Sequence, residues 1–409
     1  MSIRRSSRLS VLSAAAFLTL AADPPAPALA FPVSATPSLS LEQGYDSNIF
    51  DSRNGNEVED YFLRIRPAIS LAIPALETAV VLDVSAETDT YYNNPDLNEY
   101  PATWRGSLSP SRPIAFSPRV SMTPRGYYFE TYDSSRRSQL AFSPEAPEIP
   151  IELYQFERTH TRDYGGSLNM SYQAAQRVQT GITGAYNRHE QLTDNTGLTD
   201  YYTYRGDLTL SYQPGPRSSI GIFGSAADTT YSNDLLSIVY SVGLQGSYAF
   251  SEFLRVEGRV GESFLRNKPG NGLPENKDQS PTARLSISYR SRDFFVKAWG
   301  SYGYSLGSSF GQTKLQGNAG LSFGDQFVQG WWWSLSGSYQ SDRNIDNPSA
   351  RDRISGTGTA EIRYVPAPWA TLRLSGSFFR EWVQEYAGQD LDRATALLGV
   401  TFSKNYSLY

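Results

Sequence analysis

The sequence predicts an all-β fold, a transmembrane up-and-down antiparallel β-barrel of about 18 strands, with about 16 as the alternative. Three observations predict it. Apolar and polar residues alternate in almost every segment from Ser34 to Phe402, short and long connections alternate along the chain, and the N-terminus has the features of an export signal. Successive side chains of a strand point to opposite faces, so each strand has one apolar and one polar face.

The segment 238–250 shows the alternation most clearly. One face carries Ile238, Tyr240, Val242, Leu244, Gly246, Tyr248 and Phe250, and the other carries Ser237, Ser241, Gly243, Gln245 and Ser247. In a water-soluble protein a second layer covers the apolar face, whereas in a membrane barrel that face contacts lipid and the polar face lines the lumen. The alternation alone is compatible with both arrangements.

The N-terminal segment 1–30 favours the membrane barrel because it resembles a secretory signal peptide. Basic Arg4, Arg5 and Arg8 precede an apolar stretch, and the segment ends in the small-residue sequence Ala-Leu-Ala. We expect its removal on export, which leaves a single barrel domain over residues 31–409 in the outer membrane of a Gram-negative bacterium.

The composition agrees with a barrel. The 409-residue chain has no cysteine, so disulfides and thiolate metal sites are not available to it. Its mean hydropathy of -0.42 is typical of half-polar strands. After the signal, no apolar run approaches the roughly 18 residues that a spanning helix needs.

The predicted strands follow one another along the whole mature chain. They are 34–46, 57–71, 78–91, 98–110, 115–128, 155–172, 177–190, 200–213, 218–231, 236–250, 253–266, 279–289, 293–305, 313–323, 329–341, 353–364, 370–385 and 392–402. Beyond 402 the alternation is less regular, so either a bulge restores the register or the strand ends at Phe402 and a short tail follows. This end of the chain leaves the strand number open by two.

The connections divide into a short and a long set. Short ones such as 214–216 and 251–252 alternate with long polar ones such as 47–56, 268–278 and 342–352. Bacterial outer-membrane barrels have short periplasmic turns and longer external loops. The pattern therefore predicts an up-and-down topology with both chain ends in the periplasm.

Aromatic residues are frequent and gather towards the ends of the predicted strands. The chain has 27 tyrosines, and Trp331, Trp332 and Trp333 stand in a row. Such positions suit the aromatic girdles at the two membrane interfaces, with two of the three tryptophans facing lipid and one facing the lumen. The alternative for this row is burial in the core of a soluble sandwich.

The polar faces of the predicted strands carry many charged residues. The pore-lining candidates are Arg64, Arg66, Arg105, Arg205, Asp207, Arg255, Glu257, Arg259, Arg284, Arg290, Lys297, Arg363 and Arg373. An excess of fixed positive charge raises the local concentration of anions, so we expect a preference for anionic solutes or an anionic polymer. Equally, the arginines could pair with neighbouring carboxylates and simply fill a polar interior.

The longest connection, 129–154, differs from the others in composition. It contains Arg136 and Arg137, three prolines, and acidic residues that include Glu145 and Glu148. Loops of this length are usually functional or disordered. We expect it to fold inwards as a constriction loop with these four residues as candidates; the alternative is an external flap.

The sequence gives little basis for catalysis, and we predict no enzyme, no cofactor and no metal site. His160 and His189 lie near the outer ends of adjacent predicted strands, which would suit a hydrolase at the rim. The alternation, however, places His160 with the lipid-facing set and His189 with the lumen set. No nucleic-acid-binding stripe is present.

The first predicted strand ends in a short motif that resembles a known family. The residues are Gly44, Tyr45, Asp46, Ser47, Asn48, Ile49 and Phe50. They are similar to the G-Y-D-[SD]-N-[IV]-[FY] signature that opens many outer-membrane β-barrel porins. The resemblance implies a barrel of variable strands and, for several members, an association with exopolysaccharide export or exosortase systems. A plain turn at the mouth of the first hairpin explains the same residues.

We therefore expect an outer-membrane channel that passes solutes or exported polysaccharide, in contact with outer-membrane lipid. The barrel-assembly machinery would be its partner during biogenesis, and periplasmic polysaccharide-export components its partners in transport; nucleic acid is not expected. Two alternatives stay open: a general diffusion porin with little selectivity, and a non-conducting barrel whose external loops act as an adhesin or a rim hydrolase.

Overall fold

The computed structural model describes residues 33–50, 52, 55–75, 78–98, 102–132, 159–193, 199–269, 275–306, 313–345, 352–383 and 390–408. The predicted signal peptide, 1–30, and residues 133–154 of the predicted longest connection lie outside these ranges. Within the described part, no helix has the length and apolar character needed to cross a membrane.

The described residues form strands and one short 3-10 helix, Pro95–Leu97. The strands are β1 (Val33–Asp46), β2 (Asp60–Ala75), β3 (Thr78–Tyr91), β4 (Thr103–Pro110), β5 (Ile114–Ser117), β6 (Val120–Thr131), β7 (Thr161–Ala175), β8 (Val178–Gln191), β9 (Tyr201–Gly215), β10 (Ser218–Tyr231), β11 (Leu236–Ala249), β12 (Leu254–Lys268), β13 (Asn276–Arg290), β14 (Phe294–Ser305), β15 (Lys314–Val328), β16 (Trp331–Asn344), β17 (Arg353–Ala367), β18 (Ala370–Val383), β19 (Leu391–Ser403) and β20 (Tyr406–Leu408).

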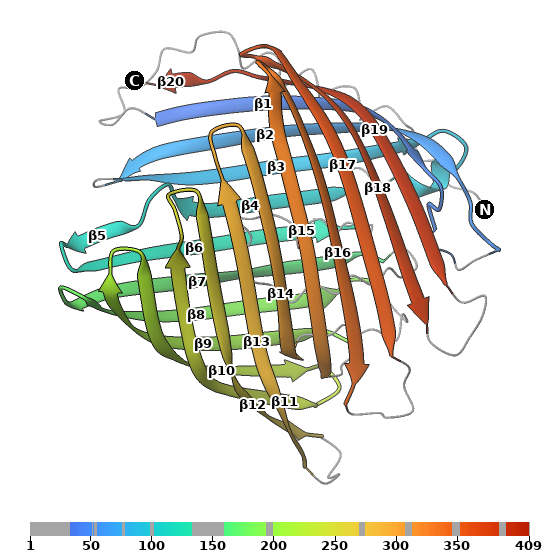
Figure 1. Cartoon of the computed structure of the whole chain (residues 1–409). Coiled ribbons are helices and arrows are strands. Elements are labelled where there is room, and N and C mark those ends of the chain that lie inside the picture. Colours follow the sequence, from blue (N-terminus) through green and yellow to red (C-terminus); the bar gives the residue numbers. More distant parts are fainter. Residues whose placement is uncertain are drawn as a thin grey trace.

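All strands belong to one antiparallel sheet that closes on itself (Figure 1). Neighbours in sequence pair with each other, and β1 closes the ring by pairing with β19 and β20. Because β4 and β5 both pair with β6, and β19 and β20 both pair with β1, the 20 strands of the described chain make 18 staves. The structure thus confirms the predicted 18-strand up-and-down barrel.

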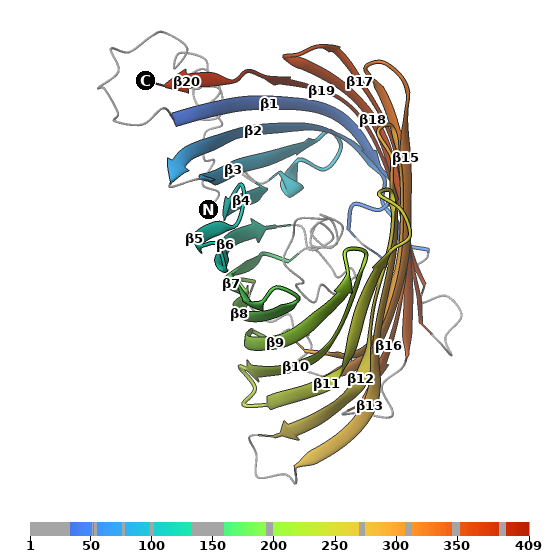
Figure 2. The same cartoon turned by 60° about the vertical axis from the view of Figure 1, so that its left-hand side comes forward.

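Short turns join the staves at one end of the barrel, here the turn end, and the strand ends that longer stretches of sequence separate lie at the opposite end, here the loop end (Figures 1 and 2). The described chain begins and finishes at the turn end, where Val33 is paired with Leu408. This arrangement agrees with the alternation of short and long connections in the sequence.

The predicted strand 115–128 is wrong in detail because it runs across a turn. The structure ends β5 at Ser117 and begins β6 at Val120. The Ser117 hydroxyl accepts hydrogen bonds from the backbone N–H groups of Arg119 at 3.3 Å and Val120 at 3.1 Å, a serine-stabilised turn. Arg119 therefore lies in this turn and not on the polar face of a strand.

The C-terminal stave contains neither a bulge nor a free tail after Phe402. Its pairing with β1 pauses at residues 404 and 405 and resumes in β20 in the same register. The N–H of Lys404 donates to the Pro37 carbonyl at 3.3 Å, but Pro37 has no N–H to return the bond. Tyr406 consequently keeps the alternation of Phe402.

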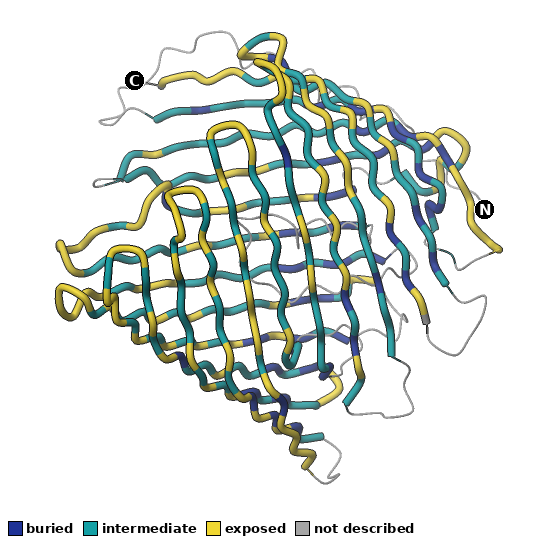
Figure 3. Tube along the Cα trace, viewed as in Figure 1, coloured by how far each residue is buried: buried dark blue, intermediate teal, exposed yellow. Residues whose placement is uncertain are grey.

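Burial and register separate two faces of the wall. On most strands one alternating set contains the buried polar side chains, such as Glu42 and Arg64, and we call this set the inner face. The other set, the outer face, exposes large apolar side chains, with Val242 58%, Leu244 59% and Leu398 62% accessible. Figure 3 shows the resulting alternation of exposed and less exposed positions. Such a continuous apolar surface is stable only in an apolar environment.

Aromatic side chains lie next to one another on part of the outer face, at the turn end. Trp331 stacks on Tyr364 with ring centroids 4.4 Å apart, and Trp369 lies parallel to Phe402 at 6.1 Å. The pairing register places Trp331 and Trp333 on the outer face and Trp332 on the inner face. Rings in this position form the girdle expected where lipid headgroups meet the hydrocarbon.

Candidate channel lumen

The pairing register places all of the sequence-predicted pore-lining residues on the inner face. These residues are Arg64, Arg66, Arg105, Arg205, Asp207, Arg255, Glu257, Arg259, Arg284, Arg290, Lys297, Arg363 and Arg373. The same face holds carboxylates that the sequence reasoning did not include, because they lie at or near strand ends. They are Glu42, Asp46, Asp60, Asp89, Asp278, Asp342 and Glu381.

The inner charges are segregated along the barrel axis. Basic residues predominate in the half of the described wall nearer the turns, namely Arg125, Arg255, Arg259, Arg284, Arg290, Lys297, Arg363 and Arg373 against Asp83, Glu257 and Glu361. The half nearer the loops contains most of the carboxylates, and several of these pair with Arg64, Arg66, Arg205, Arg353 and Arg393. The two ends of the lumen therefore differ in electrostatic potential.

The loop half contains a buried ion-pair network on β1, β2 and β3. Arg64 forms a bidentate pair with Asp89, with Nε–Oδ1 at 2.9 Å and Nη2–Oδ2 at 3.1 Å, and its Nε lies 3.3 Å from Glu87. Arg66 donates to the other Glu87 oxygen at 2.6 Å. Glu42 lies 3.8 Å from Arg64. Here the arginines fill a polar wall in the way that the alternative interpretation expected.

This network continues across the closing seam of the barrel. Glu42 also lies 3.8 Å from Arg373 on β18, whose Nε donates to Glu361 at 2.9 Å. Nearer the loops, Arg393 on β19 donates to Asp46 on β1 at 3.1 Å. Charged hydrogen bonds of this kind are about twice as strong as neutral ones, so they tie the first staves to the last.

Several cations of the turn half have no carboxylate within ion-pair distance among the described residues. They are Arg125, Arg259, Arg290, Lys297 and Arg363. Two of them lie over aromatic rings instead: Arg259 is 4.9 Å from the Phe223 ring centre, and Arg363 is 5.7 Å from that of Trp332. Arg255, by contrast, pairs with Glu257 at 2.6 Å, with both side chains more than half exposed.

The wall from β7 to β11 is lined by amides and hydroxyls. Asn169 donates to Thr183 at 3.0 Å, Gln179 donates to Ser171 at 2.7 Å, and Gln245 donates to Ser211 at 3.1 Å. In the turn half this wall has no acidic or basic side chain on its inner face. It therefore presents neutral hydrogen-bonding groups opposite the cationic strands.

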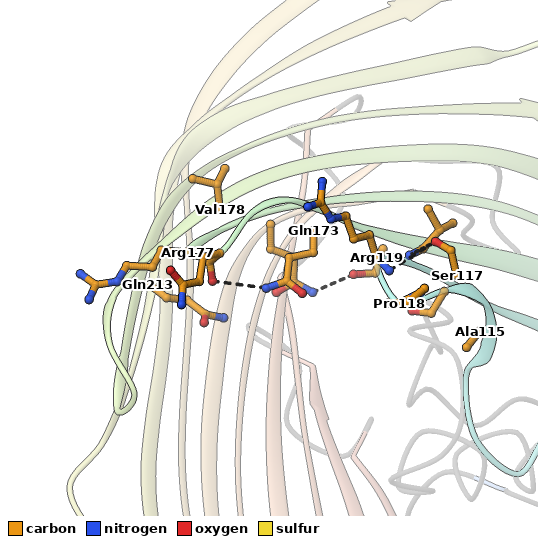
Figure 4. A pocket seen from close by; sticks show the side chains of 13 residues that line it. Ala115, Ser117, Pro118, Arg119, Gln173, Arg177, Val178 and Gln213 are labelled. Carbon is orange, nitrogen blue, oxygen red and sulfur yellow. Dashed lines mark hydrogen bonds between the residues drawn. The ribbon is translucent and has the colours of Figure 1, made fainter.

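A pocket of about 360 Å³ lies at the turn end of this neutral wall. Gln173, Gln213 and the turn residues Arg119 and Arg177 line it, and Gln173 lies between the two arginines (Figure 4). The N–H of Gln173 donates to the Arg119 carbonyl and that of Gln213 to the Arg177 carbonyl, both at 2.8 Å. No carboxylate lines the pocket.

The residues of the Gly44–Phe50 motif have a structural role at the loop end. The Asp46 carboxylate accepts the backbone N–H of Asn48 at 3.0 Å, and the Asn48 amide donates to the carbonyls of Ser52 at 2.7 Å and Asp392 at 3.0 Å. Ile49 is fully buried and packs with the inner-face rings of Phe62 and Tyr91. The motif thus joins β1 to β19 and folds over the end of the lumen.

The two histidines lie on opposite faces, as the alternation predicted. His189 is buried on the inner face, with Nδ1 2.9 Å from Asp163. His160 lies on the outer side, with Nε2 2.8 Å from Glu130 and its ring stacked on Tyr132. They cannot form a shared catalytic site. The described residues contain no group of metal-ligating side chains either.

Charged residues mark the loop-end border of the apolar outer belt. Arg162 and Arg188 both pair with Glu190, and Arg266 pairs with Glu275 at the tip of the β12–β13 hairpin. The hydrogen bond from Arg266 lowers the pKa of the Glu275 carboxyl, so this pair stays charged at neutral pH. Charges here place the loop end in water.

The constriction-loop candidates Arg136, Arg137, Glu145 and Glu148 lie outside the described residues. Of this connection, 129–154, the structure describes residues 129–132. The inward fold of the loop remains a prediction.

A closed antiparallel sheet with an apolar, aromatic-bordered outer face and a polar inner face defines a class of protein, the transmembrane β-barrels. Among solved structures, the chain is similar to Pseudomonas aeruginosa OpdK with vanillate (9% identity, TM-score 0.46, 91% of this chain and 99% of that one). It is also similar to Pseudomonas aeruginosa OccK5 (10%, 0.47, 90% and 98%) and Acinetobacter baumannii OccAB4 (10%, 0.43, 91% and 98%). No protein-family model and no curated protein matches the sequence. Similarity at this level does not assign the chain to a family.

Proposed function

We propose that this protein is a passive outer-membrane channel whose turn half favours anionic solutes, including the anionic segments of an exported polysaccharide. It acts without a chemical step, after export and insertion by the barrel-assembly machinery. The turn end faces the periplasm, as short turns do in bacterial barrels.

One observation carries the proposal. The inner wall of the turn half combines cations that have no carboxylate partner, such as Arg259, Lys297 and Arg363, with the neutral amide and hydroxyl wall of β7 to β11. Such cations attract anions because no described carboxylate lies within ion-pair distance of them. Amides and hydroxyls hydrogen-bond sugar hydroxyls without holding them by charge. Together they suit a solute that carries both carboxylates and hydroxyls.

The first test is ion selectivity of the refolded barrel in a planar bilayer under a salt gradient. We expect a reversal potential that favours anions, and block by oligogalacturonate, a polyuronate. The triple variant Arg259→Gln, Lys297→Gln and Arg363→Gln should lower the anion-to-cation permeability ratio several-fold.

A matched control removes the same number of positive charges from the outer face, through Arg188→Gln, Arg266→Gln and Arg343→Gln. It should leave the permeability ratio unchanged. A cation-selective wild-type pore would contradict the anion preference. Equal effects of the two variant sets would show that total charge, and not the luminal wall, sets the selectivity.

A further inference from the structure

The wall of the barrel is interrupted at the loop end between β13 and β14. β13 pairs with β12 as far as Asn276, but its pairing with β14 stops at Ala283, opposite Tyr302. β14 stays paired with β15 as far as Ser305. Within the described chain, the stretch 276–282 of β13 therefore has a strand on one side only, and the β12–β13 hairpin projects beyond its neighbours (Figure 2).

The ends of β14 and β15 lie instead against the inner face of β11 and β12. Leu306, directly after β14, is buried in a cluster with Leu265. The hydroxyl of Thr313, directly before β15, is 2.8 Å from that of Ser237 and donates to Asn267 Oδ1 at 3.3 Å. These contacts draw the two strand ends inwards, past β13 and onto the inner face of β11 and β12.

The separation begins at Gly303. A Cβ at this position would lie 3.0 Å from the Thr282 hydroxyl oxygen, tighter than ordinary van der Waals contact. The Thr282 hydroxyl donates to the Tyr302 carbonyl at 3.3 Å, which holds the last paired position. Glycine therefore permits β14 to turn away from β13 at the point where the pairing stops.

The unpaired edge of β13 is poorly suited to a strand from another protein. Lys277 and Pro281 lie within it, and charged residues and proline are the usual means by which sheet edges resist foreign strands. The strand that can pair there is β14, because its pairing with β13 from Ala283 to Arg290 already sets the register and holds the two strands side by side. If the existing register continued, Ser280 would lie opposite Ser305, and residue 279 opposite Leu306.

We propose that the ends of β14 and β15 form a gate with two positions. In the docked position seen here they cover part of the loop-end mouth and leave the β13 edge unpaired. In the released position they pair with β13, complete the wall and uncover the mouth. The docked position buries Leu306 and satisfies the Thr313 hydroxyl, whereas the released position would satisfy the backbone groups of the β13 edge. A two-state element requires such competing contacts. The proposal rests on the proposed function, because a gate has a role only in a conducting barrel.

Two disulfides test the gate, and the chain offers a clean background because it has no cysteine. The pair Leu265→Cys and Leu306→Cys should lock the docked position, and the pair Ser280→Cys and Ser305→Cys should lock the released one. Formation of each bond is read from gel mobility of the folded barrel, independently of current. We expect the docked lock to lower single-channel conductance at least two-fold, the released lock to raise it or remove closures, and reductant to reverse both.

The outcomes separate the gate from the channel itself. Failure of the 280–305 bond to form, or equal conductance in both locked forms, would overturn the gate while leaving a conducting pore. A reduced barrel that carries no current would contradict the proposed function instead.

A substitution that does not depend on crosslinking gives a second measure. Leu306→Ala removes the apolar contact that holds the docked position and should increase the open fraction. Leu321→Ala shortens a leucine on the outer face of β15, 47% exposed, and should not change gating. An unchanged open fraction in Leu306→Ala would contradict the docked state as the closed one.

Discussion

At the scale of single residues, the arginines of the inner face fall into two kinds that the sequence does not distinguish. Arg64 is 6% exposed and lies among Asp89, Glu87 and Glu42, whereas Arg255 has one exposed partner. Removing one member of a buried pair leaves an uncompensated charge, while an exposed pair contributes little.

Arg64→Met should therefore destabilise the barrel by about 3–5 kcal/mol, since it leaves buried carboxylates without their cation. Arg255→Met is the matched control and should cost less than about 1 kcal/mol. Urea unfolding in detergent micelles, followed by tryptophan fluorescence, measures both. Similar losses in the two variants would mean that the Arg64 network does not stabilise the fold.

Alternation in the sequence predicted the face that these arginines occupy, because strand period alone decides which face a residue occupies. It did not predict their partners. Asp46 and Asp60 lie at the loop-side ends of β1 and β2, where a pattern based on alternation cannot separate the last strand residue from the first loop residue. Register across strands, which brings Asp46 to Arg393, has no signal in one sequence.

At the scale of elements, the seam between β1 and β19 depends on one turn. The side chain of Asn48 makes hydrogen bonds to Ser52 and Asp392 and accepts one from the Ser52 N–H at 2.9 Å. It is fully buried. If the Asn48 side chain were removed, the carbonyls of Ser52 and Asp392 would lose these hydrogen bonds, and water reaches this buried place too poorly to replace them.

Asn48→Ala should thus destabilise the loop end of the seam by about 1–3 kcal/mol. Hydrogen exchange of the Ala394 amide, which donates to the Ser47 hydroxyl at 2.8 Å, should become faster. Asn169→Ala, a luminal asparagine that bonds a single threonine, serves as control and should leave Ala394 protected. Unchanged exchange at Ala394 in both variants would argue that the motif does not hold the seam.

The sequence predicted the staves well and their irregularities poorly. Period-two alternation marks the staves, but it does not predict the turn at Ser117, which two hydrogen bonds to the serine hydroxyl hold, or the pause at residues 404–405, where Pro37 has no N–H to donate. The inward ends of β14 and β15 depend on Leu306 and Thr313 meeting β11 and β12. The residues that make these contacts are far apart in sequence, so no local pattern predicts them.

At the scale of the whole molecule, the closed sheet creates a lumen with an axial asymmetry of charge. Unpaired cations gather towards the turn end, and carboxylates with their paired arginines gather towards the loop end. In the proposed channel, an anionic polymer that approached from the turn end would meet the cationic half first, whereas one from the loop end would meet the acidic half. The two ends of the lumen therefore differ in charge, which the net charge of the chain does not reveal.

Oligogalacturonate added on the turn side should consequently block the pore at a several-fold lower concentration than when it is added on the loop side, and the difference should shrink in 1 M salt, where the Debye length is about 3 Å. Orientation in the bilayer is fixed by a biotin on an engineered cysteine in the 251–252 turn, to which streptavidin binds from one side only. The triple variant at Arg259, Lys297 and Arg363 should reduce the difference because it removes three of the five unpaired cations in the described turn half. Equal block from both sides in the wild type would show that the charges near the turns do not act on a solute in the lumen, and would leave the barrel a channel without electrostatic direction.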